Sequence, residues 1–353
     1  MKDRIGMFML LGLSFLMLTL AGCSSTNSSV VYGSEGEELI LVEQFEAVRQ
    51  VMDNFFSCGR IVSIRAEDLH EIIEEQNEDY YLVDIRANQD FTKNNIAGSV
   101  SIPYAETLDV KKLETLPKDK TIVIIDYNGH QAAQTAATWK QLGYKTMPLY
   151  YGIQSWTNEL AAINYDVFPS KPLEFPLVTE EEISVAEHKL PEILYPEDET
   201  EAYITQTVNT YLDRNYKGII TAEELQASLS SDGEKQYMLI DIREPKHYKM
   251  GHVEGAINIP LHKLAEMKSL KSYPQDKRIV LIGYDGLDGS QAARALVTLS
   301  YDAVALKYGM SYWSSNETVT GIIPINNQVK VREDYLLLPL NYLAPTTAVA
   351  GCA

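Results

Sequence analysis

Three cysteines are the side chains in this sequence best suited to covalent chemistry. They stand at Cys23, Cys58 and Cys352, far apart in a chain of 353 residues. A thiolate can act as a nucleophile, bind a metal, form a disulfide or carry a lipid, and its surroundings decide which of these it does. The residues around each cysteine therefore indicate its role.

Cys23 closes an N-terminal segment that is typical of an export signal. Lys2 and Arg4 precede an apolar run, which ends with Leu20–Gly22 directly before the cysteine. Small residues before a cysteine at this place look like a bacterial lipobox, where the signal is cleaved and the cysteine is lipidated. An uncleaved membrane anchor is the alternative, because the apolar run is just long enough to cross a bilayer. We predict a signal peptide over residues 1–22 and a lipid on Cys23.

The residues after Cys23 favour a location in a bacterial cell envelope. Residues 23–40 begin with a polar run, Ser24–Ser29, which would act as a tether between the membrane and a folded body. The predicted attachment is the lipid at Cys23, with the protein facing the periplasm or the exterior. Ser24, rather than an aspartate, after the cysteine favours the outer membrane in a cell with two membranes.

Cys58 and Cys352 remain as free thiols if Cys23 carries the lipid. Outside the reducing cytosol, such a pair is permitted to form a disulfide. Two unrelated thiols are the other interpretation, and the sequence leaves both open.

Histidine and aspartate give weaker signals. The six histidines show neither paired spacing nor a cysteine cluster, so we predict no metal site and no cofactor. His130 falls in a loop where it could contact a ligand, whereas His252 is interpreted as a structural part of a Gly-His turn. Asp285 and Asp288 lie beside Gly289 but lack the ligand spacing of a calcium loop, so a solvated turn is expected there.

The charge of the chain excludes one class of partner. The formal net charge is −19, from 30 basic and 49 acidic residues. Such a surface repels the phosphate backbone of nucleic acids and disfavours wide contact with anionic lipid headgroups. Membrane attachment is therefore expected to be covalent or hydrophobic.

One sequence pattern occurs twice and supplies the elements that position these side chains. Asp241 in Leu-Ile-Asp-Ile-Arg lies 157 positions after Asp84 in Leu-Val-Asp-Ile-Arg. The same offset continues to the pair Trp156 and Trp313, both expected in the core. A constant offset over this distance indicates two homologous domains.

Each copy alternates short apolar runs with helical segments. Residues 122–125 and 279–282 are apolar runs of buried-strand length, and each precedes an alanine-rich helical stretch. The alternation predicts an α/β fold, made twice, in which a parallel sheet carries helices on both faces.

The repeat and the composition between its copies set the predicted boundaries. Helices are expected before the two cores at Leu41–Phe56 and Glu201–Asn215, and the segment after Trp313 repeats nothing in the first half. The complete division is a signal peptide at 1–22, a lipidated cysteine and tether at 23–40, a first domain at 41–165, a proline-rich acidic linker at 166–200, a second domain at 201–316 and a tail at 317–353.

The repeated pattern resembles the rhodanese-like domains. Asp241–Glu244 followed by Gly251–Pro260 is similar to the first half of that family's pattern, and the first copy matches it more loosely. Tyr151–Trp156 and Tyr308–Trp313 are similar to its closing signature. The resemblance implies two tandem rhodanese-like domains of the sulfurtransferase type.

The resemblance also marks the loop that carries the chemistry in active members of the family. There a cysteine ends a strand, and the N–H groups of the following loop surround its sulfur and favour thiolate, persulfide and oxyanion. The matching positions here are Asp126 and Gly283, and the arginine often found five positions later is Gln131 or Asp288. Neither loop is therefore expected to carry sulfur or clamp an anion, and a related phosphatase activity is disfavoured for the same reason. Arg294, further along, is interpreted as a surface or packing residue.

Two interpretations of Asp126 stay open. Its carboxylate could occupy the place of the missing anion and cap the following helix, or it could face the solvent.

We predict an envelope lipoprotein whose two catalytically degenerate rhodanese-like domains act as a binding or scaffolding module. One alternative is a thiosulfate or persulfide sulfurtransferase that uses a displaced thiol, Cys58 or Cys352. Another is a protein that binds a small oxyanion. Resemblance to other envelope lipoproteins of this type implies an association with sulfur, selenium or electron-transfer systems and a protein partner in the envelope, which the sequence does not name.

Overall fold

The sheets and their helices belong to one compact unit. The computed structural model describes residues 34–59, 61–159, 162, 164, 167–180, 185–195, 199–213, 218–230, 236–328 and 335–338. The chain divides into the units Met1–Leu39 and Ile40–Ala353, and the described strands all lie in the second. Within the described ranges, no helix combines the length and the apolar character needed to cross a bilayer. The predicted signal peptide and Cys23 lie outside those ranges.

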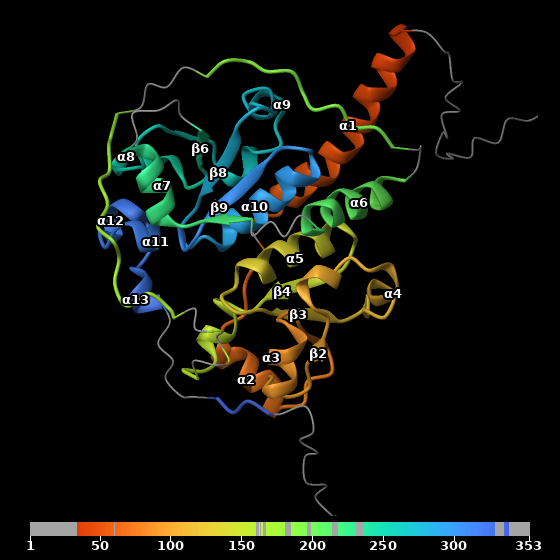
Figure 1. Ribbon diagram of the computed structural model, residues 1–353, viewed down its shortest axis with the longest axis vertical. Helices are drawn as coiled ribbons and strands as arrows, with labels where there is room; N and C mark the ends of the chain where they lie inside the picture. Colours follow the sequence, from red (N-terminus) through yellow and green to blue (C-terminus); the bar gives the residue numbers. More distant parts are fainter. Residues whose placement is uncertain are drawn as a thin grey trace, which may run out of the picture. The chain divides into compact units, whose positions relative to one another are not determined.

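The first domain is a four-stranded parallel sheet in the order β2-β1-β3-β4. Its strands and helices, drawn in orange and yellow in Figure 1, are α2 (Ala66–Glu74), β1 (Tyr80–Asp84), α3 (Asn88–Lys93), β2 (Val100–Ser101), η1 (Tyr104–Glu106), α4 (Val110–Leu113), β3 (Thr121–Ile125), α5 (His130–Gln141), β4 (Lys145–Pro148) and η2 (Gly152–Ser155).

The second domain is a five-stranded parallel sheet in the order β5-β9-β8-β6-β7. Its elements are β5 (Ile219–Ile220), α7 (Ala222–Leu229), β6 (Tyr237–Asp241), α8 (Pro245–Met250), β7 (Ala256–Asn258), η3 (Leu261–Lys263), α9 (Met267–Leu270), β8 (Arg278–Ile282), α10 (Leu287–Thr298), β9 (Ala303–Leu306), α11 (Gly309–Trp313), α12 (Glu317–Thr320) and α13 (Ile325–Gln328). The first domain has only an isolated bridge between Ile64 and Leu149 near the place of β5.

The central strands explain why both sheets are covered on two faces. Successive side chains of a strand point to opposite faces. Ile122 and Ile124 accordingly join one apolar cluster, whereas Val123 and Ile125 join another, and β8 repeats this division. A strand that is apolar at every position must be buried on both sides. The predicted α/β fold, two parallel sheets with helices on both faces, is confirmed.

Two longer helices precede the domains, as the sequence predicts. They are α1 (Ser34–Ser57) and α6 (Thr200–Asp213). The first helix begins earlier than expected, and the sequence of its first turns contains three acidic residues, Glu35, Glu37 and Glu38, a residue type that favours the positive end of a helix dipole. The linker contains no helix or strand in its described parts, 167–180 and 185–195, as its prolines predict.

Candidate functional site

Two equivalent loops join a central strand to the helix that follows it. The first connects β3 to α5 through Gly129, and the second connects β8 to α10 through Gly286. Both glycines have positive φ, +89° and +81°, and a Cβ on either would lie within 3.0 Å of the main chain that follows the last strand. The backbone therefore requires glycine at these two turns. Ligands of parallel α/β sheets bind at this carboxyl edge, so the loops are the candidate site.

The Asp126 carboxylate fills the N–H nest of the first loop. Its Oδ1 accepts from Gly129 N at 2.6 Å, and its Oδ2 accepts from Gln131 N at 2.9 Å and from Ala132 N at 3.1 Å. The side chain is 0% exposed. The capping interpretation is confirmed, and the solvent-facing alternative is wrong. Burial raises the pKa of Asp126 to about 6, although the three N–H groups oppose that shift.

Asp288 also accepts main-chain N–H bonds in its loop, but it stands at the sixth position of the second loop, whereas Asp126 stands at the first position of the first loop. Its Oδ2 accepts from Tyr284 N at 3.2 Å, and its Oδ1 accepts from Gly289 N at 2.8 Å. A Cβ built on Gly283 would lie only 2.0 Å from Asp288 Oδ1. The carboxylate of Asp288 thus occupies the space that a side chain at position 283 would need.

The solvated turn expected at Asp285 and Asp288 is therefore wrong. Both residues are buried, at 1% and 4% exposure. Asp285 Oδ1 accepts from Leu287 N at 3.0 Å, and Asp285 Oδ2 accepts from Tyr150 OH of the first domain at 3.4 Å. A partner more than a hundred positions away buries this turn, which no local pattern indicates.

In each loop, a carboxylate at the first or the sixth position therefore accepts N–H bonds of the nest. In the first loop it is Asp126 at the first position, with the half-buried Gln131 at the sixth. In the second loop the first position is Gly283 and the sixth is Asp288. A carboxylate cannot carry sulfane sulfur, and it uses the N–H donors that a bound oxyanion would need.

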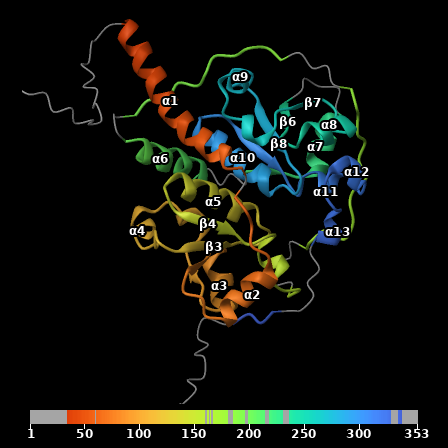
Figure 2. The ribbon, with the colours of Figure 1, turned by 180° about the vertical axis from the view of Figure 1, so that it is seen from behind.

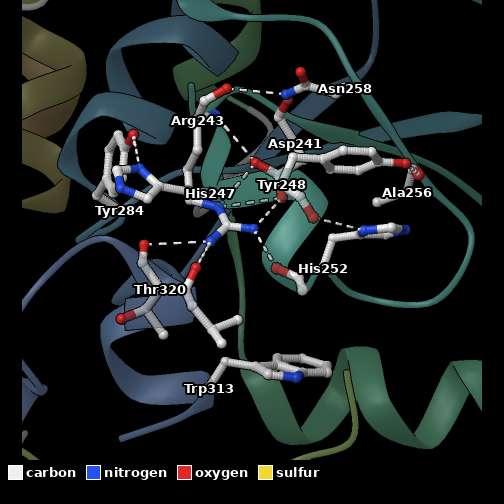
Figure 3. A network of polar contacts seen from close by, with 12 residues as sticks. Asp241, Arg243, His247, Tyr248, His252, Ala256, Asn258, Tyr284, Trp313 and Thr320 are labelled. Carbon is white, nitrogen blue, oxygen red and sulfur yellow. Dashed lines mark hydrogen bonds and ion pairs between the residues drawn. The ribbon is translucent and has the colours of Figure 1, made fainter. Parts of the chain in front are cut away.

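A buried ion pair holds the end of the strand beside each loop. In the second domain, Arg243 Nη2 lies 2.6 Å from Asp241 Oδ2, and both side chains are fully buried (Figure 3). The guanidinium also donates to the carbonyls of Gly251, Val319 and Thr320 at 2.9–3.2 Å. These donations satisfy the remaining N–H groups, which a buried ion pair requires.

The first domain repeats this pair with Arg86 and Asp84 at 2.7 Å. Arg86 donates to the carbonyls of Asn94 and Ala162. Because Val319 lies 157 positions after Ala162, the structural repeat continues beyond Trp313. The expectation that this segment repeats nothing is wrong, and the recurring Asp-Ile-Arg pattern was the sequence signal for the pair.

Two tyrosines tie the loops to neighbouring helices. Tyr284 OH bonds to His247 Nδ1 at 2.8 Å, as Figure 3 shows, and it also accepts from Glu244 N at 3.1 Å. Tyr127 OH in the first loop accepts from Ala87 N at 3.2 Å and donates to Asp90. Burial raises the pKa of both tyrosines, so they stay protonated donors.

The two loops lie against the opposite domain. His130, the first residue of α5, is fully buried, with Nδ1 2.9 Å from Ser290 Oγ and Nε2 accepting from Tyr308 N at 3.3 Å. Leu287 is the equivalent residue of α10 and is also buried. The expectation that His130 could contact a ligand from a loop is wrong, because the other domain occupies both ring nitrogens.

Reciprocal glutamines show that the domains meet by a pseudo-twofold relation. Gln291 Nε2 donates to Ile61 O at 3.1 Å and its Oε1 accepts from Ile61 N at 2.8 Å. Gln134 Nε2 donates to Gly218 O at 3.4 Å. Both the two glutamines and their two partners are 157 positions apart, so each domain makes the equivalent contact on the other.

Arg294 belongs to the same interface. Its Nη2 donates to Tyr104 OH at 2.6 Å and to Gln134 Oε1 at 2.8 Å, and its guanidinium lies 4.8 Å from the ring centre of Tyr211. Since the residue is only 2% exposed, the packing interpretation is confirmed and the surface interpretation is wrong.

The remaining expected residues are placed as follows. Trp156 and Trp313 are buried, as expected, and the ring of His252 stacks on Tyr248, a structural role. Cys58 is exposed after the end of α1, and Cys352 lies outside the described residues, so the disulfide and the two unrelated thiols both stay open. Across the described ranges, no three His, Cys, Asp or Glu side chains gather as metal ligands do.

A small cavity of about 230 Å³ adjoins the second loop. Asp285, Asp288 and Arg65 line it together with Tyr150 and Gln291. A second cavity, of about 620 Å³, is lined by residues 185–187 and by residues of α8, β7 and α9, and none of its lining residues belongs to either loop.

The comparison with known families agrees with this geometry. The family model described as Rhodanese-like domain matches residues 65–159 and 221–316, which together make up more than half of the chain. The chain belongs to the rhodanese-like family. The two matched ranges contain both loops, so the tandem arrangement inferred from the repeat is confirmed.

Relatives of this rhodanese-like chain match over single domains. The probable adenylyltransferase/sulfurtransferase MoeZ of Mycobacterium tuberculosis is 32% identical over 27% of this chain and 24% of its own length. M-phase inducer phosphatase 2 of Homo sapiens is 33% identical over 24% of this chain and 16% of its own length. This chain therefore spans less than two thirds of either relative.

A solved structure aligns across both domains. The alignment with thiosulfate sulfurtransferase from Pseudomonas aeruginosa covers 77% of this chain and 47% of that chain, with 16% sequence identity and a TM-score of 0.27. Values this low carry no information about function.

Proposed function

We propose that this protein is a non-catalytic binding or scaffolding module built from two rhodanese-like domains. The supporting observation is that a carboxylate of the loop itself fills each N–H nest, Asp126 in the first domain and Asp288 in the second. The N–H groups that these carboxylates accept from are therefore already used, and a persulfide or an oxyanion in the nest would have to displace the carboxylate. Burial of both loops against the opposite domain further restricts substrate access.

The sulfurtransferase alternative needs a displaced thiol. Cys58 is exposed directly after the C-terminal end of α1, so it lies in neither loop and away from their N–H groups. The oxyanion-binding alternative meets the same obstacle as catalysis, because the nest donors already bond to carboxylates. We therefore favour the binding module over both alternative functions.

Sulfur loading tests the proposal directly. The purified protein is incubated with thiosulfate or a persulfide donor, and its intact mass is measured. We expect no added sulfur and no transfer to cyanide, whereas transfer that Cys58→Ser abolishes would establish the displaced-thiol enzyme.

A matched pair of variants tests the obstacle itself. Gly283→Cys alone should load little sulfur, because Asp288 occupies the space of the new side chain. Gly283→Cys combined with Asp288→Arg frees the nest and supplies a cation, so it should load more. Equal loading in the two variants would contradict the proposed role of Asp288.

We further propose that the module is held at the surface of a bacterial membrane by a lipid on Cys23. The support is the sequence before this cysteine, Leu20–Gly22 at the end of an apolar run. Cys23→Ser should release the protein from membranes or leave an unprocessed precursor, read by fractionation and intact mass. A variant that is processed and membrane-bound like its parent would refute lipidation.

A further inference from the structure

An extended segment of the linker lies along the edge of the second domain. Phe175 N donates to Trp313 O at 3.0 Å, and Trp313 Nε1 donates to Pro176 O at 3.1 Å. Val178 and His252 then exchange two main-chain bonds, each of 2.9 Å, as an antiparallel bridge. The segment is therefore fixed by the tryptophan at one end and by main-chain pairing at the other.

A segment of the tail lies in the same way along the first domain. Tyr335 N donates to Trp156 O at 3.2 Å, and Trp156 Nε1 donates to Leu336 O at 3.4 Å. Leu338 and Asn95 exchange two main-chain bonds of 2.8 and 2.9 Å as an antiparallel bridge. Figure 1 and Figure 2 both show this short blue segment beside the orange helices of the first domain.

The two docking sites are equivalent, although the segments are connected differently. The receiving residues keep the offset of the repeat, since Trp313 follows Trp156 and His252 follows Asn95 by 157 positions. The segments 175–178 and 335–338 share one burial pattern, in which only the second residue is exposed. Each segment follows one domain along the chain but docks on the other.

The side chains of both segments follow one pattern. An acidic residue comes first, then an aromatic residue, an exposed residue and two aliphatic residues, as in Glu174–Val178 and in Asp-Tyr-Leu-Leu-Leu ending at Leu338. The Phe175 ring meets Trp313 edge to face at 5.1 Å, and the Tyr335 ring lies 4.8 Å from Trp156. Two chemically similar segments that reach equivalent sites by different routes indicate recognition of the pattern itself.

We propose that each domain carries a docking site for an extended peptide of this pattern, and that a partner's segment takes the place of the tail on the first domain. This rests on the proposed binding function and names the class of partner. Main-chain pairing between an extended peptide and a domain, together with burial of alternate side chains of the peptide, is a recognised mode of peptide binding.

The first domain is the exchangeable site for two reasons. The linker segment joins the two domains and makes further bonds, from Leu173 N to Tyr312 O and from Ser315 N to the Glu174 carboxylate. The tail segment lies beyond the second domain, so its departure leaves the link between the domains intact. A partner can therefore take the place of the tail without breaking the link between the domains.

The test uses the full chain with Tyr335→Ala and Leu337→Ala, which removes both inward-facing tail anchors. A fluorescent peptide of residues 333–340 is titrated by anisotropy. We expect it to bind this variant about tenfold or more tightly than the parent chain, in which the tethered tail competes. The single variant Tyr335→Ala, which keeps the main-chain bonds, gives the same comparison if the double variant fails to fold.

Matched peptides and a site variant give the controls. Leu336 is 72% exposed, so a Leu336→Ala peptide should bind unchanged, whereas a Tyr335→Ala peptide should lose about tenfold or more. The ring of His70 stacks on Tyr335 at 4.4 Å. The substitution His70→Ala in the double-variant protein should therefore weaken peptide binding.

Three results would overturn the proposal. They are no binding to a variant whose circular dichroism matches the parent, equal losses for the Leu336→Ala and Tyr335→Ala peptides, and a parent chain that is a dimer which the peptide splits. The last would assign the site to a second copy of this chain. None of these results depends on sulfur loading, so failure here and failure of the proposed function remain distinguishable.

Discussion

Asp126→Ala removes a carboxylate that accepts three main-chain N–H bonds inside a fully buried loop. Loss of a capping side chain costs about 1 kcal/mol, and a buried donor left without a partner costs about 1–3 kcal/mol. Where the carboxyl group is neutral, we therefore expect the variant to be less stable than the parent by about 3 kcal/mol.

The cost should shrink as the pH rises. Burial raises the pKa of Asp126 from 3.8 to about 6, so the folded protein keeps this proton to higher pH than the unfolded chain does. The stability that the group contributes is complete below 3.8 and is lost as the pH rises through about 6. Two pKa units correspond to roughly 3 kcal/mol, of which about 2 kcal/mol falls between about pH 4.5 and about pH 7.5.

Urea unfolding of parent and variant at these two pH values measures the effect. Asp109→Ala is the control for an ordinary exposed cap, because Asp109 accepts from Lys112 N at the surface and its loss should cost about 1 kcal/mol. If the advantage of the parent over Asp126→Ala grows with pH, the N–H groups stabilise the anion more than burial penalises it. That result would refute the reasoning.

Three further changes test the geometry. Gly283→Ala should destabilise the second domain by about 1–3 kcal/mol, because its Cβ meets Asp288 Oδ1, and much less once Asp288→Ala is present; a double-mutant cycle in urea that finds no coupling would contradict this. Asp241→Ala should cost about 3–5 kcal/mol in the same assay, since it leaves a guanidinium buried without its partner; an unchanged unfolding midpoint would be incompatible with the ion pair. Gln291→Ala should loosen the contact between domains, so that tryptophan fluorescence in urea shows two transitions; one transition at the parent midpoint would argue against that contact.

Local patterns in the sequence predicted most of the fold. The apolar run over 122–125 could be assigned to a buried strand because its alternate side chains serve two cores. The capping role of Asp126 could also be predicted from the sequence, because its first N–H partner, Gly129, lies only three positions later. Such information lies within a few residues of the side chain concerned.

Long-range contacts decided what the sequence could not predict. His130 meets Ser290 and Asp285 meets Tyr150, so their burial depends on residues more than a hundred positions away. The sequence does not reveal the repeat beyond Trp313 for another reason. Tyr335 lies 160 rather than 157 positions after Phe175, and the two segments share the type of side chain rather than its identity.

The docking of segment 335–338 on the first domain also has a consequence for folding during translation. The first domain leaves the ribosome early, yet the residues that pair with Asn95 and cover Trp156 are translated only after the entire second domain. Until then the incomplete chain exposes the unpaired main-chain groups of Asn95 and part of the surface of Trp156, and exposed groups of this kind favour association with other chains. A fragment that ends after the first domain would keep these groups exposed permanently, so it should aggregate more readily than the whole chain.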